Sequence, residues 1–176
     1  YDPVGNRTSF TDANSHATHY AYTAKDLLST VTDPLSGVTS FAYDANNNQI
    51  SLTDPLNRTT SFGYDALNRR TSLTDPLTNL TTYAYDPNGN RTSIVDPNGH
   101  ATSYAFDALN RLSTVTDAAN GTVSYGYDAV GNRLTVTDAN GHVTSSTFDA
   151  DNRLLMTADP LRDTSTSSAS RSAKWR

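Results

Sequence analysis

The chain has 176 residues, a formal net charge of −5 at pH 7 and no cysteine. Only 35% of its residues are hydrophobic, which is below the roughly 45–50% of ordinary globular domains. These numbers disfavour a deep two-layer core, exclude disulfides and thiolate metal sites, and argue against a nucleic-acid partner. No apolar run approaches the ~20 residues that a membrane-spanning helix requires, so membrane insertion is not expected.

The charged residues are of few types. All 18 acidic residues are aspartate, and lysine occurs only at Lys25 and Lys174, beside eleven arginines. Glutamate and lysine are strong helix formers, whereas the abundant serine, threonine and asparagine suit strands and turns. We therefore expect an all-β fold.

An aromatic residue returns every 21 residues through eight repeats, without insertion or deletion. A fixed period of this length indicates a repeat architecture. We number the positions of each repeat from this aromatic residue, so that repeat 1 begins at Tyr1 and repeat 5 at Tyr85. The eight residues at position one are Tyr1, Tyr22, Tyr43, Tyr64, Tyr85, Phe106, Tyr127 and Phe148.

A first turn is expected at positions two to five of each repeat. Position two is aspartate in every repeat except the second, where Thr23 replaces it. Position five is always Gly, Asn or Asp, as in Gly89 and Asn110. These residue types tolerate a positive φ, which a tight turn requires.

A second turn is expected at positions twelve to fifteen, where aspartate is followed by Pro or Ala. Proline suits the second place of a type I or II turn. Hydrogen bonding of the aspartate within its own turn explains this position; calcium binding is the alternative, but each turn offers a single carboxylate. The eight aspartates at position twelve are Asp12, Asp33, Asp54, Asp75, Asp96, Asp117, Asp138 and Asp159.

Runs of about six residues rich in Thr, Ser, Val, Ile and aromatic residues separate the turns, which is the length and composition of strands. Position ten is mostly apolar, and positions twenty and one form an aromatic pair such as Tyr83 and Tyr85. Residues two apart on a strand share a face. Two strands and two turns in each repeat predict one antiparallel meander of about sixteen strands.

The turns alternate at spacings of ten and eleven residues, so one loop must be odd in length and the other even if the apolar positions are to share a face. We expect a three-residue loop at the second turn, with its last residue in the left-handed conformation, and a four-residue loop at positions two to five.

Sixteen strands at ~4.8 Å are too many for a flat sheet, so an open, curved or spiral sheet is predicted. The array of repeats is expected to cover residues 1–163. Residues 164–176 lose the pattern and are expected to form an irregular, disordered tail.

These motifs resemble the YD repeat of Rhs and teneurin-type proteins. The resemblance rests on YDPNGNR at residues 85–91 and TDANG at residues 137–141, recurs in all eight repeats and identifies the chain as a fragment of such a protein. It implies a segment of a β-shell on a secreted or cell-surface bacterial protein, which encapsulates or scaffolds a toxin or effector. The partners would be further YD repeats and the C-terminal toxin or effector of the parent protein.

The same resemblance implies that the segment is not an enzyme. The family's release chemistry lies in a separate core segment that has no match here, so no catalytic, cofactor-binding or metal-binding residue is assigned and no cofactor is expected. The Tyr, Phe and Asp residues of positions one and twelve are therefore interpreted as structural repeat residues.

One alternative stays open from the residues. Sugar rings stack on aromatic side chains, so the aromatic rows could form an extracellular carbohydrate-binding or cell-adhesion module with glycans as partners, although packing between strands also explains them. Arginines at positions six and seven are expected to pair with turn aspartates or to lie over aromatic rings. The histidines at position sixteen (His16, His100 and His142) are expected to be surface polar residues.

Overall fold

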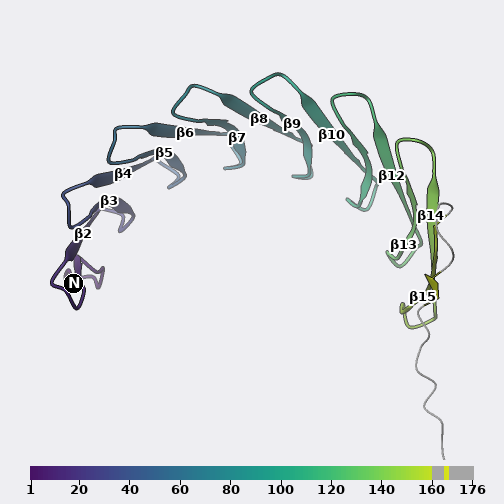
Figure 1. Ribbon diagram of the computed structural model, residues 1–176, viewed down its shortest axis with the longest axis horizontal. Helices are drawn as coiled ribbons and strands as arrows, with labels where there is room; N and C mark the ends of the chain where they lie inside the picture. The colour runs from purple at the N-terminus through teal and green to yellow at the C-terminus, as the bar shows by residue number, and fades with distance from the viewer. Residues whose placement is uncertain (160–164, 167–176) are drawn as a thin grey trace, which may run out of the picture. The chain divides into compact units, whose positions relative to one another are not determined.

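The computed structural model of the chain describes residues 1–159 and 165–166. The described residues form strands joined by tight turns, with no helix among them (Figure 1). The predicted end of the array at residue 163, and the predicted tail apart from residues 165–166, lie outside the described residues.

The predicted antiparallel meander is confirmed. The strands stand in one open sheet in the order in which they occur in the chain, and each pair whose register is known is antiparallel, as in β1–β2, β7–β8 and β12–β13. No pairing corresponds to parallel coils of a β-helix within the described residues. The strands are β1 (Ser9–Thr11), β2 (Ala17–Tyr22), β3 (Leu28–Thr32), β4 (Val38–Tyr43), β5 (Gln49–Thr53), β6 (Thr59–Tyr64), β7 (Arg70–Thr74), β8 (Leu80–Tyr85), β9 (Arg91–Val95), β10 (Ala101–Phe106), β11 (Leu112–Thr116), β12 (Thr122–Tyr127), β13 (Arg133–Thr137), β14 (Val143–Phe148), β15 (Leu154–Ala158) and β16 (Ser165–Thr166).

The chain divides into two compact parts. The first comprises Tyr1–Tyr83 with Asp96–Asn98, and the second comprises Ala84–Val95 with Gly99–Arg176. Each part is built from the same hairpins, so the local geometry given below applies to both.

The loop at the second turn is the predicted three-residue loop. In repeat 1 the backbone NH of Asp12 donates to the carbonyl of His16, and the NH of Ser15 donates to the carbonyl of Asp12. Ser15 has a φ of 65°, which is the left-handed residue that closes this kind of hairpin.

The predicted four-residue loop at positions two to five is wrong. The NH of Asp2 donates to the carbonyl of Asn6, and the NH of Gly5, whose φ is 96°, donates to the carbonyl of Asp2. Both turns are therefore three-residue loops of the same kind, and the odd residue of the repeat must be accommodated elsewhere.

A β-bulge accommodates that residue. Tyr20 pairs with Val31 and Ala21 with Thr30, but Tyr22 pairs with Leu28, so Ser29 is an extra residue on β3. A bulge of this kind bends the strand and increases its twist. The same shift occurs in β4–β5, β6–β7, β10–β11, β12–β13 and β14–β15.

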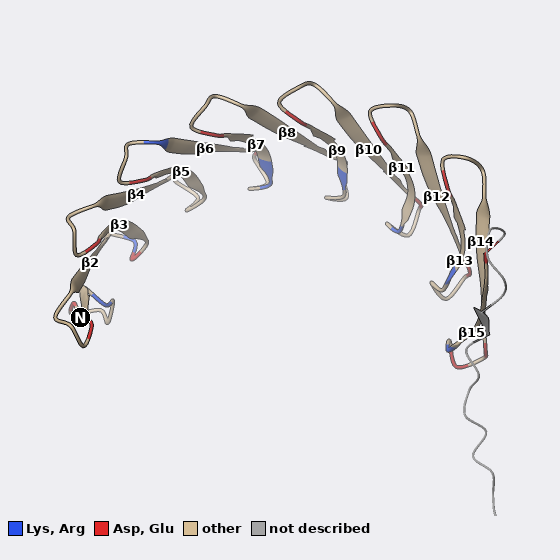
Figure 2. Ribbon diagram, viewed as in Figure 1, with Lys and Arg blue, Asp and Glu red and all other residues tan. Residues whose placement is uncertain are grey.

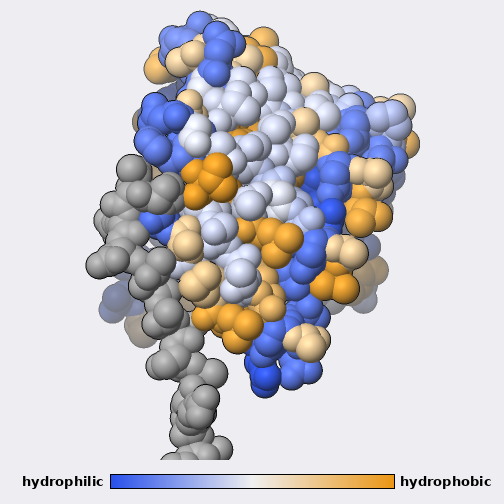
Figure 3. Space-filling model, turned by 90° about the vertical axis from the view of Figure 1, so that its right-hand side faces the viewer, coloured by the Kyte–Doolittle hydropathy of each residue, from blue (hydrophilic) through white to orange (hydrophobic). Residues whose placement is uncertain are grey.

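The register gives the sheet two unlike faces. Tyr20, Val31 and Thr39 are cross-strand neighbours and share the side that we call the aromatic face. Ala21, Thr30 and other small or hydroxyl residues occupy the opposite side, which we call the hydroxyl face. Figure 3 shows residues of intermediate hydropathy in a pale central band between hydrophilic turns.

The described part of the chain has no fully buried residue, either apolar or polar. The strand residues are mostly half-buried, whereas apolar residues at turn tips are exposed, with Leu35 at 92%. The sheet is thus a single layer, as the low apolar content predicted, and its stability depends on contacts between neighbouring strands.

Candidate functional surface

Aspartates organise both kinds of turn. At Asp54, Oδ1 accepts hydrogen bonds from the backbone NH groups of Leu56 (2.9 Å) and Arg58 (3.0 Å), and Oδ2 accepts one from Nε of Arg58 at 2.7 Å. Asp65, at position two of repeat 4, forms the same three bonds with Leu67 and Arg69. One carboxylate thus satisfies two backbone donors of its loop.

Thr23 performs the same task at the one first turn that lacks aspartate. Its Oγ1 accepts from the NH groups of Lys25 and Leu27, both at 3.2 Å. The threonine side chain has a single oxygen, which leaves none to pair with another side chain. Thr23 therefore accepts two side-chain hydrogen bonds in its turn, whereas Asp65 accepts three. The departure of repeat 2 from the motif is therefore a conservative one.

The turn contacts lower the pKa of most of these carboxyl groups. At Asp54, the hydrogen bond from the Arg58 side chain and then that from the Arg58 backbone hold the pKa below its usual 3.8. At Asp138, His142 lowers the pKa of the carboxyl first through its side chain and then through its backbone NH. Each group accepts donors that favour the charged form.

The arginines make both of the predicted contacts. Those at position six pair with the aspartate of their own turn: Arg69 with Asp65, Arg111 with Asp107 and Arg153 with Asp149. Arg111 also lies over an aromatic ring, its guanidinium carbon being 4.6 Å from the ring centre of Tyr127. Arginines at position seven lie over aromatic rings. Their guanidinium carbons are close to the ring centres in the pairs Arg70 with Phe62 (4.7 Å), Arg91 with Tyr104 (5.7 Å) and Arg133 with Tyr125 (5.7 Å).

The charge pattern separates turns from strands. The described strands contain no acidic residue, and the aspartates up to Asp151 lie in turns. Figure 2 accordingly shows red and blue at the turns and at the strand ends beside them, with the remaining strands tan. The aromatic face is therefore uncharged except where arginines stack on its rings.

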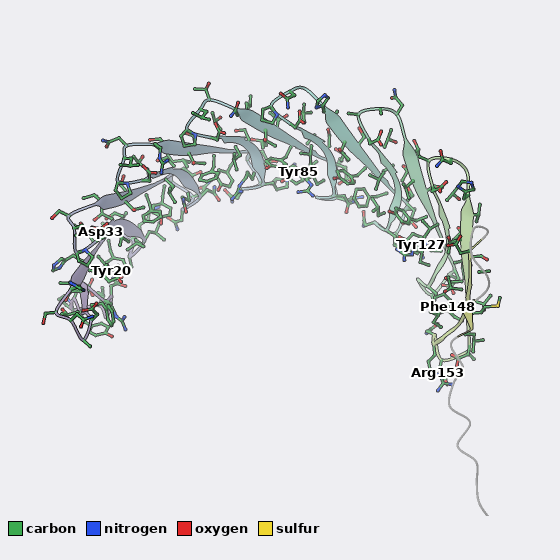
Figure 4. All side chains as sticks on the ribbon, in the orientation of Figure 1. Tyr20, Asp33, Tyr85, Tyr127, Phe148 and Arg153 are labelled. Atoms are coloured by element: carbon green, nitrogen blue, oxygen red, sulfur yellow. The ribbon has the colours of Figure 1, made fainter. Side chains whose placement is uncertain are left out.

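The position-one tyrosines form a contact that the sequence did not reveal. The hydroxyl of Tyr43 donates to the carbonyl of Leu28 at 2.9 Å, and Tyr127 does the same to Leu112 at 2.9 Å. In each case the acceptor lies 15 residues earlier, at position seven. This residue is in the preceding strand, next to the bulge. Figure 4 labels Tyr85, Tyr127 and Phe148, each at the end of a strand.

The only signal for this contact was a preference for tyrosine over phenylalanine at position one, where six of the eight aromatic residues are Tyr. Packing alone would accept either ring, so this preference indicates a task for the hydroxyl. Sequence reasoning treated the whole row as packing residues and missed it.

The structure does not gather the predicted repeat residues into one chemical site. The residues of position one and of position twelve recur once in each repeat, near opposite ends of the strands. His16 and His142 each contact the turn aspartate four residues earlier, Nδ1 lying 3.1 Å and 2.9 Å from Oδ2. Residues 1–159 and 165–166 contain no group of three or more side chains suited to hold a metal, and no helix long and apolar enough to cross a membrane.

Comparison with known proteins agrees with this architecture. The family model described as RHS Repeat matches residues 1–38, 22–58, 43–80, 71–101, 85–123, 106–143 and 127–164. No curated protein sequence matches the chain.

Several solved structures share the fold. A crystal structure of TcdB2-TccC3-Cdc42 superposes with a TM-score of 0.66 at 15% identity, over 86% of this chain and 10% of that one. A structure of the Tc holotoxin pore from Photorhabdus luminescens, with the mutation TccC3-D651A, gives 0.62 at 17% identity over 93% of this chain and 12% of that one. The chain therefore spans about a tenth of the length of these structures.

The alternative interpretation as a carbohydrate-binding module finds no support in these comparisons. The family model covers nearly the whole described sheet, and the meander of hairpins is the fold of the matched structures. The chain is a run of RHS repeats and belongs to the RHS repeat family.

Proposed function

We propose that this chain is a non-catalytic wall segment of a secreted or cell-surface bacterial protein, where with further RHS repeats it encloses a toxin or effector. The observation that carries the proposal is the single-layer sheet of repeated hairpins, which has no buried core and no clustered chemical groups among its described residues. Such a sheet suits a wall better than it suits a compact binding or catalytic domain.

The distribution of charge supports the same role. The strands carry no acidic residue, and their side chains on the hydroxyl face are mostly Ser, Thr, Ala and Gly. A surface of this kind offers a contained polypeptide few strong, specific contacts. The charged groups lie in the turns, where they hold each hairpin together.

The likeness to TcdB2-TccC3 supports the proposal at the level of the fold. The partners we propose are therefore defined by chemistry: neighbouring RHS repeats along the sheet, and a C-terminal toxin or effector of the same parent protein inside the shell.

A protease-protection experiment tests this function. The parent protein that contains this segment would be produced with its C-terminal effector replaced by a small reporter domain, and treated with a nonspecific protease. We expect the reporter to survive in the intact protein and to be digested once two repeats of this segment are deleted. Equal digestion rates in the two proteins would contradict encapsulation. A separate assay tests the non-catalytic role: hydrolase turnover by the purified segment would contradict it if one point mutation abolished that turnover.

A further inference from the structure

The first turn of the repeat exists in two versions that alternate along the chain. Repeats 1, 3, 5 and 7 have asparagine at position six, and we call these asparagine turns. The other repeats have leucine or arginine there, with a basic residue in the turn, and we call these cation turns. The row of first turns therefore repeats every 42 residues. The residues at position six are Asn6, Leu27, Asn48, Arg69, Asn90, Arg111, Asn132 and Arg153.

Each asparagine turn is hydrogen bonded to the turn that follows it. Nδ2 of Asn90 donates to Asp86 within its own turn (2.9 Å) and to Oδ1 of Asn110 in the next turn (2.8 Å). The two hydrogens of the amide thus have separate acceptors. The bond to the next turn recurs from Asn6 to Asp26 (3.0 Å), from Asn48 to Asn68 (2.7 Å) and from Asn132 to Asn152 (2.8 Å).

In cation turns, a positively charged side chain donates to a backbone carbonyl of the next turn. Arg111 uses Nε to bond Asp107 at 2.7 Å and one terminal nitrogen to bond the backbone carbonyl of Asp128, in the next turn, at 2.8 Å. In repeat 2 the residue at position six is apolar, and Lys25, two residues earlier, donates instead to the carbonyl of Ala45 at 2.7 Å. Lys25 also donates to Oδ1 of Asn47 at 3.1 Å. Two different residues therefore bond a backbone carbonyl of the next turn, and Lys25 adds a side-chain acceptor.

The last described cation turn provides an internal comparison. Arg153 bonds its own aspartate at 2.7 Å just as Arg111 does, yet its side chain is 73% exposed against 26% for Arg111. Its other nitrogen pairs with Asp151, at 3.0 Å, within the same turn. Arg69 and Arg111, which are each followed by a described asparagine turn, are 25% and 26% exposed.

The two kinds of turn are not interchangeable as neighbours. An asparagine needs a side-chain acceptor at position five of the next turn, and the cation turns supply one as Asp or Asn. Three of the four asparagine turns have glycine at that position (Gly5, Gly89 and Gly131) and offer no side chain at all. Arg111 needs only a backbone carbonyl, which the turn of Gly131 supplies. Lys25 bonds a backbone carbonyl in the turn of Asn47, the one asparagine turn without glycine at position five.

We propose that the alternating turns determine which repeats can stand next to each other, so that the building block of this sheet is a pair of repeats. An asparagine turn takes a cation turn as its C-terminal neighbour, and a cation turn takes an asparagine turn. A further repeat that docks after a cation turn such as that of Arg153 is one with Gly-Asn at positions five and six. This inference concerns assembly and does not depend on what the shell encloses.

The hydrogen bond from an asparagine turn to the next turn is tested first, in the full chain. Asn110→Gly removes the acceptor that Asn90 and Asn88 both use. Asn120→Gly is the matched control, because Asn120 has a similar φ of 67° against 59° and its side chain bonds none of the described residues. We expect Asn110→Gly to lower the melting temperature by about 2–4 °C relative to Asn120→Gly. Equal melting temperatures would refute the bond's role.

The pairing rule is tested by deletion. Removing residues 106–126 places the turn of Asn90 before that of Gly131, whereas removing residues 106–147 places it before Asn152 and keeps the alternation. Gly131→Asn should raise the melting temperature of the first deletion, because it restores an acceptor for Asn90, and should not raise that of the full chain. Replacing Asn88 and Asn90 together by Ala should abolish the gain, because both amides donate to the residue at position five of the next turn. A gain of equal size in both chains, or one that survives the double replacement, would overturn the proposal. If the first deletion alone fails to fold and Gly131→Asn rescues folding, the rule is supported, and failure of rescue contradicts it.

Discussion

The hydroxyl of the position-one tyrosine is expected to stabilise the array independently of its ring. We would replace Tyr43, Tyr64 and Tyr127 together by Phe, which removes hydroxyls that bond the carbonyls of residues 28, 49 and 112 at 2.9–3.0 Å. A net contribution of about 0.5–1.5 kcal/mol per bond predicts a loss of about 1.5–4.5 kcal/mol in the free energy of unfolding, if the sites add. The melting temperature should fall by roughly 2–4 °C for each kcal/mol.

The matched control replaces Tyr20, Tyr104 and Tyr125, at position twenty, by Phe. Their hydroxyls form no hydrogen bond with the described residues, so the same change of composition should leave stability nearly unchanged. Unfolding in guanidinium chloride, followed by circular dichroism, gives the midpoint and the slope, and an unchanged slope shows that the variants unfold over the same surface. In the reverse experiment, Phe106→Tyr should stabilise the chain, because Phe106 occupies the same position.

Two results would refute this reasoning. Equal losses in the two triple variants would show that the hydroxyl acts through solvation or ring packing and not through the bond to position seven. Destabilisation by Phe106→Tyr would show that the carbonyl opposite that residue is not available to a hydroxyl.

Three further outcomes are expected. Tyr85→Ala, in the middle of the array, should cost about 1–2 kcal/mol because the side chain is half-buried, whereas Tyr1→Ala should cost little because Tyr1 is 78% exposed; equal losses in chemical denaturation would contradict the array. Stability should stay level from pH 7 to pH 5 and fall only as the pH drops below about 3.8, because the pKa values of turn carboxyls such as Asp65 are lowered in the folded state, so that their contribution is present above the unfolded value and lost through the folded one; midpoints measured across this range that already fall by pH 5 would be inconsistent with it. Asp65→Ala should lower the melting temperature clearly more than Asp151→Ala, since Asp65 bonds two backbone NH groups and Arg69 while Asp151 forms one exposed ion pair; a larger effect at Asp151 would reverse this assignment.

Much of this protein follows from local sequence. The period, the positions of both turns, the strands between them and the aromatic face were all predicted, because they depend on short-range preferences. Asp or Thr at the start of a turn, Gly or Asn at a positive φ, and alternation along a strand each act over a few residues. Thr23 and Asp65 form their contacts within five residues of chain, so the repeat unit itself contains the information.

The tertiary structure decided which contacts form between neighbouring strands and turns. The parity of the repeat allowed either an even loop or a bulge, and the bulge at Ser29 appears only once Tyr22 is paired with Leu28. The bond from Tyr43 joins residues 15 apart, and the bond from Asn90 to Asn110 joins residues 20 apart. Such contacts depend on the register of neighbouring strands, which local preferences constrain but do not specify, so the pairing of one turn with the next became visible only in the folded sheet.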